Sequence, residues 1–421
     1  MKKNFFTLLF CLMVVSTQLW AVAPILKKIT SGGIEREYLV YTPSNYDASN
    51  AGDVGLLVCL HGLNCSMDDF FDDYHIELVA DALNFVVIAP NALPEQDNKV
   101  KTNVNSLTSA TGMPLDLSAV WGAGLLVDVV VAPEDEWAFG VFGLSDFELN
   151  KDVDDVAFIK TIINNTQVDY TKINSQHIFM LGTSMGSYMT YRYAMTYGDG
   201  LAGLISVAGT MGLAIPEKTF TKPLPVCDFH CETDETVPYT GNFLYTIGSY
   251  PVTIKFGKPK SEVISQWVTW NGATTTPEVI NYDIPGKPSA IKYAYSATAG
   301  GAEVIHYKLS RADHSHYFAT TKGDAIDFNE EILNFVTRNK ITSGTPHLQQ
   351  DKIAFYPNPA RDFIRFNLSE GAINIYELSG GKVFSGQLTG QDIDVSYLVK
   401  GMYIVQIEAG NTMLTHKLIK E

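Results

Sequence analysis

Ser184 lies in the sequence Gly-Thr-Ser-Met-Gly, residues 182–186, where an apolar run meets a run with helical spacing. The apolar residues 177–181 predict a strand, and residues 187–197 predict a helix. A turn that joins a strand so tightly to a helix needs glycine on both sides, and it lifts the serine hydroxyl out of the backbone. The positive end of the helix favours negative charge that develops beside that hydroxyl. We therefore expect Ser184 to be a nucleophile.

A nucleophilic serine needs a base that takes its proton and an acid that orients the base. On an α/β-hydrolase sheet the order along the chain is serine, then Asp or Glu, then histidine. His314 lies in a polar loop expected between the last strand and the last helix, and we prefer it as the base over His316. His306 alternates with Val304 and Lys308 inside a strand, so we expect it at the surface.

The orienting acid is expected after a strand that lies between the nucleophile and the base. Residues 224–230 have the composition of that strand, and the loop that follows contains Asp234. We expect Asp234 to orient His314, with Glu232 and Glu235 as less favoured substitutes. A purely local role for Asp234, as a turn or helix cap, remains an alternative.

Attack of a serine on a carbonyl produces an oxyanion that backbone N–H groups stabilise. One donor is expected from Met185, the residue after the nucleophile. The second should come from the loop at residues 61–64, and we expect Leu63 to supply it. His61 is expected to be a structural histidine beneath this turn.

The elements that carry these residues alternate between strands and helices. Continuous apolar runs at 55–60 and 85–90 are typical of strands covered on both faces. Further strands are expected at 34–41 (an edge strand), 201–207, 224–229, 291–296 and 303–309, with helices at 154–165, 261–270 and 324–338. The expected fold class is α/β, with a mostly parallel α/β-hydrolase sheet and helices on both faces. We place this α/β-hydrolase domain at residues 24–340.

Residues 95–150 interrupt the alternation and carry several aromatic residues. This stretch follows the end of a strand, where open α/β sheets bind their ligands. We interpret it as a lid-like insertion or a pocket wall, with Trp121 as a candidate substrate-binding residue. The alternative is a satellite cluster that packs on itself.

The end of the chain has a different pattern. Residues 341–352 read as a linker, and residues 353–421 contain short apolar runs separated by turn sequences. That pattern predicts a small all-β sandwich domain.

The N-terminus and the composition bear on location and partners. Residues 1–23 have the basic start and short apolar stretch of a secretion signal.

A net charge of −16 argues against nucleic acid or anionic lipid as the main partner. We expect no transmembrane segment and no cofactor. The cysteines lack zinc-site spacing, so we also expect no structural metal.

Several motifs together resemble the secreted polyhydroxybutyrate depolymerase/feruloyl esterase family. They are the serine turn, Arg192 in the helix after it, the His-x-x-x-Asp-x-x-Val-Pro-Tyr stretch at 230–239, Asp313-His314-Ser315, and the stretches at 36–43, 120–124, 153–159 and 271–272. The resemblance covers residues 30–338 and implies Ser184, Asp234 and His314 as nucleophile, acid and base. The implied activity is hydrolysis of a feruloyl or acetyl ester on plant polysaccharide, or of a polyester such as polyhydroxybutyrate.

The C-terminal region is similar to the sorting domains of type IX secretion substrates. The similarity rests on Tyr356-Pro357-Asn358-Pro359, on Gly401-Met402-Tyr403 and on the basic end at 417–420. It implies the secretion machinery as a partner, and a secreted or cell-surface protein exported through the periplasm. A carbohydrate-binding β module is the alternative.

The sequence thus favours a secreted serine esterase that works through an acyl-enzyme. A serine peptidase on the same fold is the second hypothesis, because triad chemistry does not distinguish esters from amides. A non-catalytic surface binding protein that retains the scaffold is the third.

Overall fold

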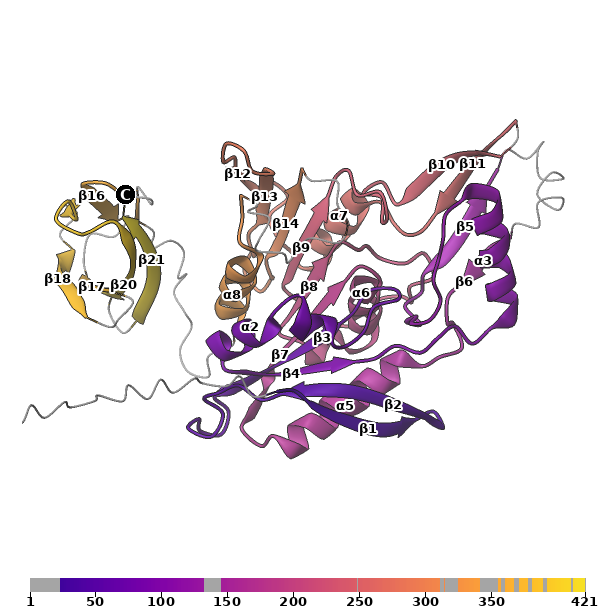
Figure 1. Ribbon diagram of the computed structural model, residues 1–421, viewed down its shortest axis with the longest axis horizontal. Coiled ribbons are helices and arrows are strands. Elements are labelled where there is room, and N and C mark those ends of the chain that lie inside the picture. Colours follow the sequence, from indigo (N-terminus) through magenta and orange to yellow (C-terminus); the bar gives the residue numbers. More distant parts are fainter. Residues whose placement is uncertain are drawn as a thin grey trace, which may run out of the picture. The chain divides into compact units, whose positions relative to one another are not determined.

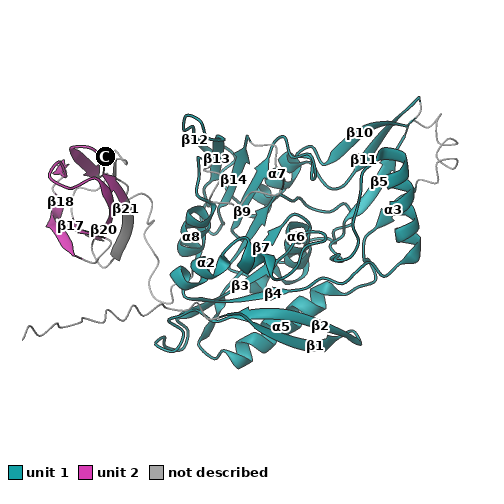
Figure 2. Ribbon diagram, viewed as in Figure 1, with its two compact units in different colours: residues 1–341 teal, residues 342–421 magenta. Residues whose placement is uncertain are grey.

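The computed structural model describes residues 23–131, 145–247, 249–310, 314, 325–340, 355–356, 360–366, 371–377, 381–388, 392–409 and 412–420. The chain forms two compact units, residues 1–341 and 342–421, which are coloured separately in Figure 2. The expected signal at 1–23, apart from its last residue, and the expected linker at 341–352 lie outside the described residues.

A ten-stranded sheet runs through the larger unit (Figure 1). Its order is β1 (Ile25–Ser31), β2 (Ile34–Tyr41), β4 (Phe85–Pro90), β3 (Val54–Leu60), β7 (Ile173–Thr183), β8 (Gly203–Val207), β9 (Val226–Cys231), β14 (Val304–Leu309), β13 (Ala290–Tyr295) and β12 (Glu278–Tyr282). The six strands from β4 to β14 are parallel, and the two strands at each end are antiparallel. The predicted mostly parallel sheet is confirmed.

Helices cover both faces of this sheet, because the central strands are apolar on both sides. In β3, Leu56 and Val58 belong to one core cluster and Leu57 and Cys59 to the other. The first cluster includes side chains from α5 (Asp155–Asp169), α6 (Met185–Tyr197) and α7 (Lys260–Trp270). The second includes side chains from α1 (Asp69–Asp72), α2 (Ile76–Leu83) and α8 (Phe328–Asn339). The continuous apolar runs in the sequence reflect this two-sided burial.

One strand position differs from the prediction. We expected residues 34–41 to form an edge strand, but β1 pairs antiparallel along the outer side of β2. Gly32 and Gly33 make the tight turn between them, with φ of 59° and 80°. The sequence of β1 did not reveal a strand because its side chains are largely exposed and lack an apolar face.

A second, smaller sheet belongs to the same unit. Its order is β10 (Asn242–Ile247), β11 (Tyr250–Lys255), β5 (Leu126–Val130) and β6 (Phe147–Glu148). Together with helix α3 (Asn98–Thr111), strands β5 and β6 form the described part of the insertion expected at 95–150. Trp137, Phe139 and Phe142 of that insertion lie outside the described residues.

In its described residues, the C-terminal unit contains strands and no helix, as predicted. One sheet contains β15 (Phe355–Tyr356), β16 (Phe363–Phe366) and β19 (Ile393–Asp394). The other contains β18 (Lys382–Leu388), β17 (Gly371–Glu377), β20 (Gly401–Ala409) and β21 (Thr412–Lys420). Ile364, Ile375, Val405 and Leu418 are buried together in one core that joins strands of both sheets.

Candidate active site

The serine turn joins β7 to α6 in a strained backbone conformation. Ser184 has φ of 52° and ψ of −119°, a region that L residues with a side chain rarely adopt. The flanking glycines are required by close backbone contacts. A Cβ on Gly182 would stand 2.2 Å from the Gly186 carbonyl oxygen, and one on Gly186 would stand 1.9 Å from that of Leu60. The turn therefore presents the hydroxyl of Ser184 at the end of the strand.

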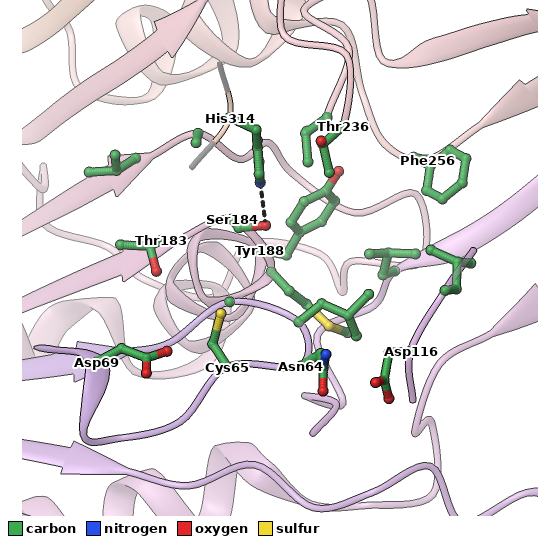
Figure 3. Close-up of a pocket in the computed structure, with 18 of the residues that line it drawn as sticks. Asn64, Cys65, Asp69, Asp116, Thr183, Ser184, Tyr188, Thr236, Phe256 and His314 are labelled. Carbon is green, nitrogen blue, oxygen red and sulfur yellow. Dashed lines mark hydrogen bonds between the residues drawn. The ribbon is translucent and has the colours of Figure 1, made fainter. Parts of the chain in front are cut away.

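The structure brings Ser184, His314 and Asp234 together in one hydrogen-bonded chain. His314 Nε2 lies 2.9 Å from Ser184 Oγ, the contact dashed in Figure 3. On the other side of the ring, His314 Nδ1 lies 2.7 Å from Asp234 Oδ2. A neutral ring with its proton on Nδ1 satisfies both contacts, so Nε2 can accept the serine proton. His316, the less favoured candidate for the base, lies outside the described residues.

The loop after β9 holds the Asp234 carboxylate in place. The backbone N–H groups of Thr236 and Val237 donate to Asp234 Oδ1 over 2.9 and 2.8 Å. Burial alone would raise the pKa of Asp234, but the hydrogen bonds from His314 and Val237 hold it below its ordinary value. Asp234 is therefore a carboxylate at neutral pH. The substitutes Glu232 and Glu235 are both exposed, and Glu232 pairs with Lys308 over 2.8 Å.

Both expected oxyanion donors belong to residues that line the cavity around Ser184. Met185 begins α6, and the first N–H groups of a helix have no acceptor within it. Leu63 follows Gly62, which packs so closely on the nucleophile that an added Cβ would stand 3.2 Å from Ser184 Cβ. The arrangement is compatible with two N–H donors beside the serine.

Trp121 requires a correction. We expected it to contact substrate, but its side chain is fully buried in the core and is not part of the cavity lining in the described residues. Its indole Nε1 donates to the carbonyl oxygen of His61 over 2.9 Å. Asp155 fixes the next residue, because Oδ2 accepts from the Gly122 N–H over 2.7 Å. Trp121 thus supports the loop that leads to Leu63.

His61 is the structural histidine that we predicted. Its side chain is 1% exposed, its Nδ1 donates to the Gly62 carbonyl over 2.7 Å, and its Nε2 accepts from the Ala92 N–H over 3.0 Å. His306 is different from the prediction: it is 4% exposed, and its Nδ1 lies 2.8 Å from Asp228 Oδ2. Residue alternation along β14 did not reveal this burial, because the groups that cover His306 come from distant parts of the chain.

A cavity of about 680 Å³ opens beside the serine (Figure 3). Its described wall is mostly apolar and includes Leu63, Leu115, Leu125, Leu149, Met185, Val237 and Phe256. Three carboxylates, Asp69, Asp73 and Asp116, also line it, whereas no lysine or arginine occurs among its described lining residues. Leu115, Asp116, Leu125 and Leu149 come from the 95–150 region. That region therefore forms part of the pocket wall.

Cys65 is a second nucleophilic side chain in the same cavity. Burial, with a further contribution from the Asp69 carboxylate, raises the pKa of the Cys65 thiol to about 11. A thiol is a poor nucleophile until it ionises. Ser184, which has a base within hydrogen-bond distance, is therefore the better nucleophile of the two.

Tyr188 carries a buried hydroxyl in the cavity wall. Its side chain is 1% exposed, and its hydroxyl has no hydrogen-bond partner among the described residues. Leaving a buried hydroxyl unpaired costs about 1–3 kcal/mol. Replacing Tyr188 with Phe should therefore raise the free energy of unfolding by about 1 kcal/mol, measured by urea titration.

Tyr191→Phe is the matched control for this prediction. Tyr191 lies on the same helix and is fully buried, but its hydroxyl donates to Asp228 over 3.3 Å. Its loss should lower the free energy of unfolding. Equal losses in the two variants would show that the Tyr188 hydroxyl has a partner.

The buried neutral histidines predict a pH dependence of stability. Burial lowers the pKa values of His61 and His230 to about 4, from an ordinary value of 6.5. Between these values the unfolded chain binds protons that the folded chain does not. Stability should therefore fall as the pH falls from 6.5 to 4, by up to about 1.4 kcal/mol per pH unit for each histidine.

Melting curves across this window should test His61. The His61→Gln variant should lose stability less steeply than the wild type as the pH falls. Identical slopes in the two proteins would contradict a neutral, buried His61.

Two regions of the chain match models of known protein families. Residues 139–247 match the family model described as Phospholipase/Carboxylesterase. This match includes Ser184 and Asp234 and ends before His314. Residues 354–421 match the Secretion system C-terminal sorting domain.

Individual relatives share only part of the chain or have low identity. The putative esterase NocK of Nocardia uniformis subsp. tsuyamanensis is 30% identical over 95 residues, which are 22% of this chain and 27% of that protein. An acetyl xylan esterase from Aspergillus awamori has 13% identity and a TM-score of 0.40, covering 68% of this chain and 92% of its own. A thermostable esterase has 14% identity and a TM-score of 0.40, covering 75% of this chain and 62% of its own.

The sheet and the serine turn are those of an α/β hydrolase, and residues 139–247 of the larger unit are similar to the Phospholipase/Carboxylesterase family. The C-terminal match indicates type IX secretion and a cell-surface or secreted protein. No helix in the described ranges has the length and apolar character needed to span a membrane.

Proposed function

We propose that this chain is a secreted serine carboxylic-ester hydrolase that works through an acyl-enzyme. The observation that supports it most is the chain of contacts from Ser184 Oγ through His314 to Asp234, 2.9 and 2.7 Å long, on a strained turn at the end of β7. The side chains of these three residues, which are far apart in the sequence, meet in the geometry that acyl transfer needs.

The chemistry follows from the protonation states of the three side chains. His314 Nε2 takes the hydroxyl proton as Ser184 Oγ bonds to the ester carbonyl carbon. The Met185 and Leu63 N–H groups stabilise the resulting oxyanion, an effect worth about 3 kcal/mol per donor. The oxyanion collapses, the bond to the alcohol oxygen breaks, and His314 gives that oxygen its proton. Water then repeats the attack on the acyl-serine and releases the acid.

The cavity favours an ester without negative charge. Asp69, Asp73 and Asp116 line it, and a phosphate or carboxylate on the substrate would find no cationic partner in the described wall. The lining therefore favours an uncharged carboxylic ester over a phospholipid, whose ester bonds lie close to a phosphate. We propose feruloyl or acetyl esters of plant polysaccharide, or a polyester such as polyhydroxybutyrate.

Export is the second part of the proposal. Residues 1–23 would direct the chain into the periplasm, and the C-terminal domain would engage the secretion machinery that carries it to the cell surface or the medium. The sorting-domain match at residues 354–421 supports this route.

Purified full-length protein should be assayed on methyl ferulate, acetylated xylan, polyhydroxybutyrate, a lysophospholipid and a dipeptide anilide. We expect turnover of at least one neutral ester and none of the lysophospholipid. The Ser184→Ala protein is the control for background hydrolysis. Turnover of the anilide alone would favour a peptidase, and no turnover together with no reaction with a fluorophosphonate would favour a binding protein.

A further inference from the structure

Asp228 is a fully buried carboxylate in β9 that the proposed chemistry does not use. Its Oδ1 accepts from Lys260 Nζ and from Ser206 Oγ, each over 2.7 Å, and from the Tyr191 hydroxyl over 3.3 Å. Its Oδ2 accepts from His306 Nδ1 over 2.8 Å. These donors come from α7, β8, α6 and β14, so one side chain links four elements to β9.

One side of this network reaches the nucleophile. Ser206 Oγ lies 2.6 Å from the hydroxyl of Ser187, which is in the first turn of α6 after Ser184. Lys260 Nζ also donates to the carbonyl oxygen of Gly209. Gly209 packs on the serine turn itself, because an added Cβ would stand 2.4 Å from the Ser184 carbonyl oxygen.

The other side of the network reaches the loop that carries Asp234. The Tyr239 hydroxyl lies 2.7 Å from His306 Nε2, and the Tyr239 carbonyl accepts from the Lys260 N–H over 3.0 Å. A neutral His306 satisfies both of its contacts, with Nδ1 donating to Asp228 and Nε2 accepting from Tyr239. The loop from Asp234 to Tyr239 is thus fixed at its far end by the same carboxylate.

The charges in this network compensate one another. Burial alone would raise the pKa of Asp228, but the Lys260 ammonium and His306 hold it well below its ordinary value. Lys260 is itself fully buried and pairs with Asp228. Removing either partner of this pair would leave an uncompensated buried charge.

We propose that Asp228 is a positioning residue. It holds the serine turn and the Asp234 loop in the relative positions that let His314 contact both Ser184 and Asp234. It acts through Ser206 and Lys260 on one side and through His306 and Tyr239 on the other. The role rests on the proposed function, because the relative position of Ser184 and Asp234 affects the rate only if both act through His314. A misplacement of about 1 Å in such a constellation can lower the rate about 100-fold.

Tyr239→Phe removes one hydroxyl from the network without leaving a buried charge. We expect it to lower kcat for p-nitrophenyl acetate about 10-fold or more while KM stays unchanged. Tyr307→Phe is the matched control: it is a buried tyrosine on the neighbouring strand β14 whose hydroxyl donates to Glu331, and it has no described contact with Asp228. It should lower the melting temperature and leave kcat unchanged.

Ser206→Ala provides a second variant on the other side of Asp228, and it should also lower kcat with KM unchanged. The measurements are made on the full-length protein, and melting curves show that each variant is folded at the assay temperature. Equal kcat values for the wild type, Tyr239→Phe and Ser206→Ala would overturn the positioning role, as would equal losses in Tyr239→Phe and Tyr307→Phe. An inactive wild type would instead overturn the proposed function.

Discussion

Replacing Ser184 with alanine should lower kcat/KM for p-nitrophenyl acetate by about 10,000-fold or more. The substitution removes the atom that bonds to the ester carbon, whereas His314 and the backbone donors remain. The melting temperature should not fall, because the hydroxyl makes one partly buried hydrogen bond and the strained backbone is unchanged. Steady-state kinetics and thermal melting test these two expectations.

Two further variants test whether the loss of activity comes from the Ser184 hydroxyl itself. Ser184→Gly should be equally inactive and more stable than Ser184→Ala, because glycine adopts φ of 52° without strain. Ser261→Ala changes an exposed serine at the start of α7 and should behave as the wild type. Retention of most activity in Ser184→Ala would rule out an acyl-enzyme on this residue.

Replacing Asp234 with asparagine should lower kcat by about 10,000-fold. The amide can donate a hydrogen bond to His314 Nδ1, which favours the tautomer with its proton on Nε2. That tautomer cannot accept the proton of Ser184. Because asparagine has nearly the shape of aspartate, the loop should remain folded, and KM should change much less than kcat.

Asp116→Asn is the matched control for this effect. Asp116 lines the same cavity and undergoes the same chemical change, but its carboxylate accepts from the Ser118 N–H and has no described contact with His314. Its kcat should stay within a few-fold of the wild type. Similar losses in both variants would mean that the negative charge of the cavity, rather than the orientation of His314, controls the rate.

The parallel core of the fold was predictable because burial on both faces leaves a simple trace in the sequence. Strands β3 and β4 are fully buried, and their residues form continuous apolar runs. The elements that were not predicted are helices α1, α2 and α3 and strands β1, β5, β6, β10, β11 and β12. The hairpin strands β10 and β12 have almost no fully buried residues, so their alternation of apolar and polar residues is weak.

The candidate site was predictable where it depends on chain order. Ser184, Asp234 and His314 were selected by the elements that they follow, and the structure places them in contact. Trp121 was misassigned because the sequence does not distinguish an aromatic residue that supports a loop from one that lines a pocket. The Asp228 network was not predicted, since its members lie far apart in sequence and no local pattern connects them.

The most direct measurement is the site of covalent labelling by a fluorophosphonate. The reagent phosphonylates a serine only when a base activates it, and tandem mass spectrometry identifies the modified residue. We predict a single adduct on Ser184 within the tryptic peptide 173–192, distinguished from Ser175 and Ser187 by fragmentation, and its loss in the Asp234→Asn protein. Ester hydrolysis without an adduct on Ser184, or an adduct on another residue, would contradict the central claim that Ser184 is the nucleophile.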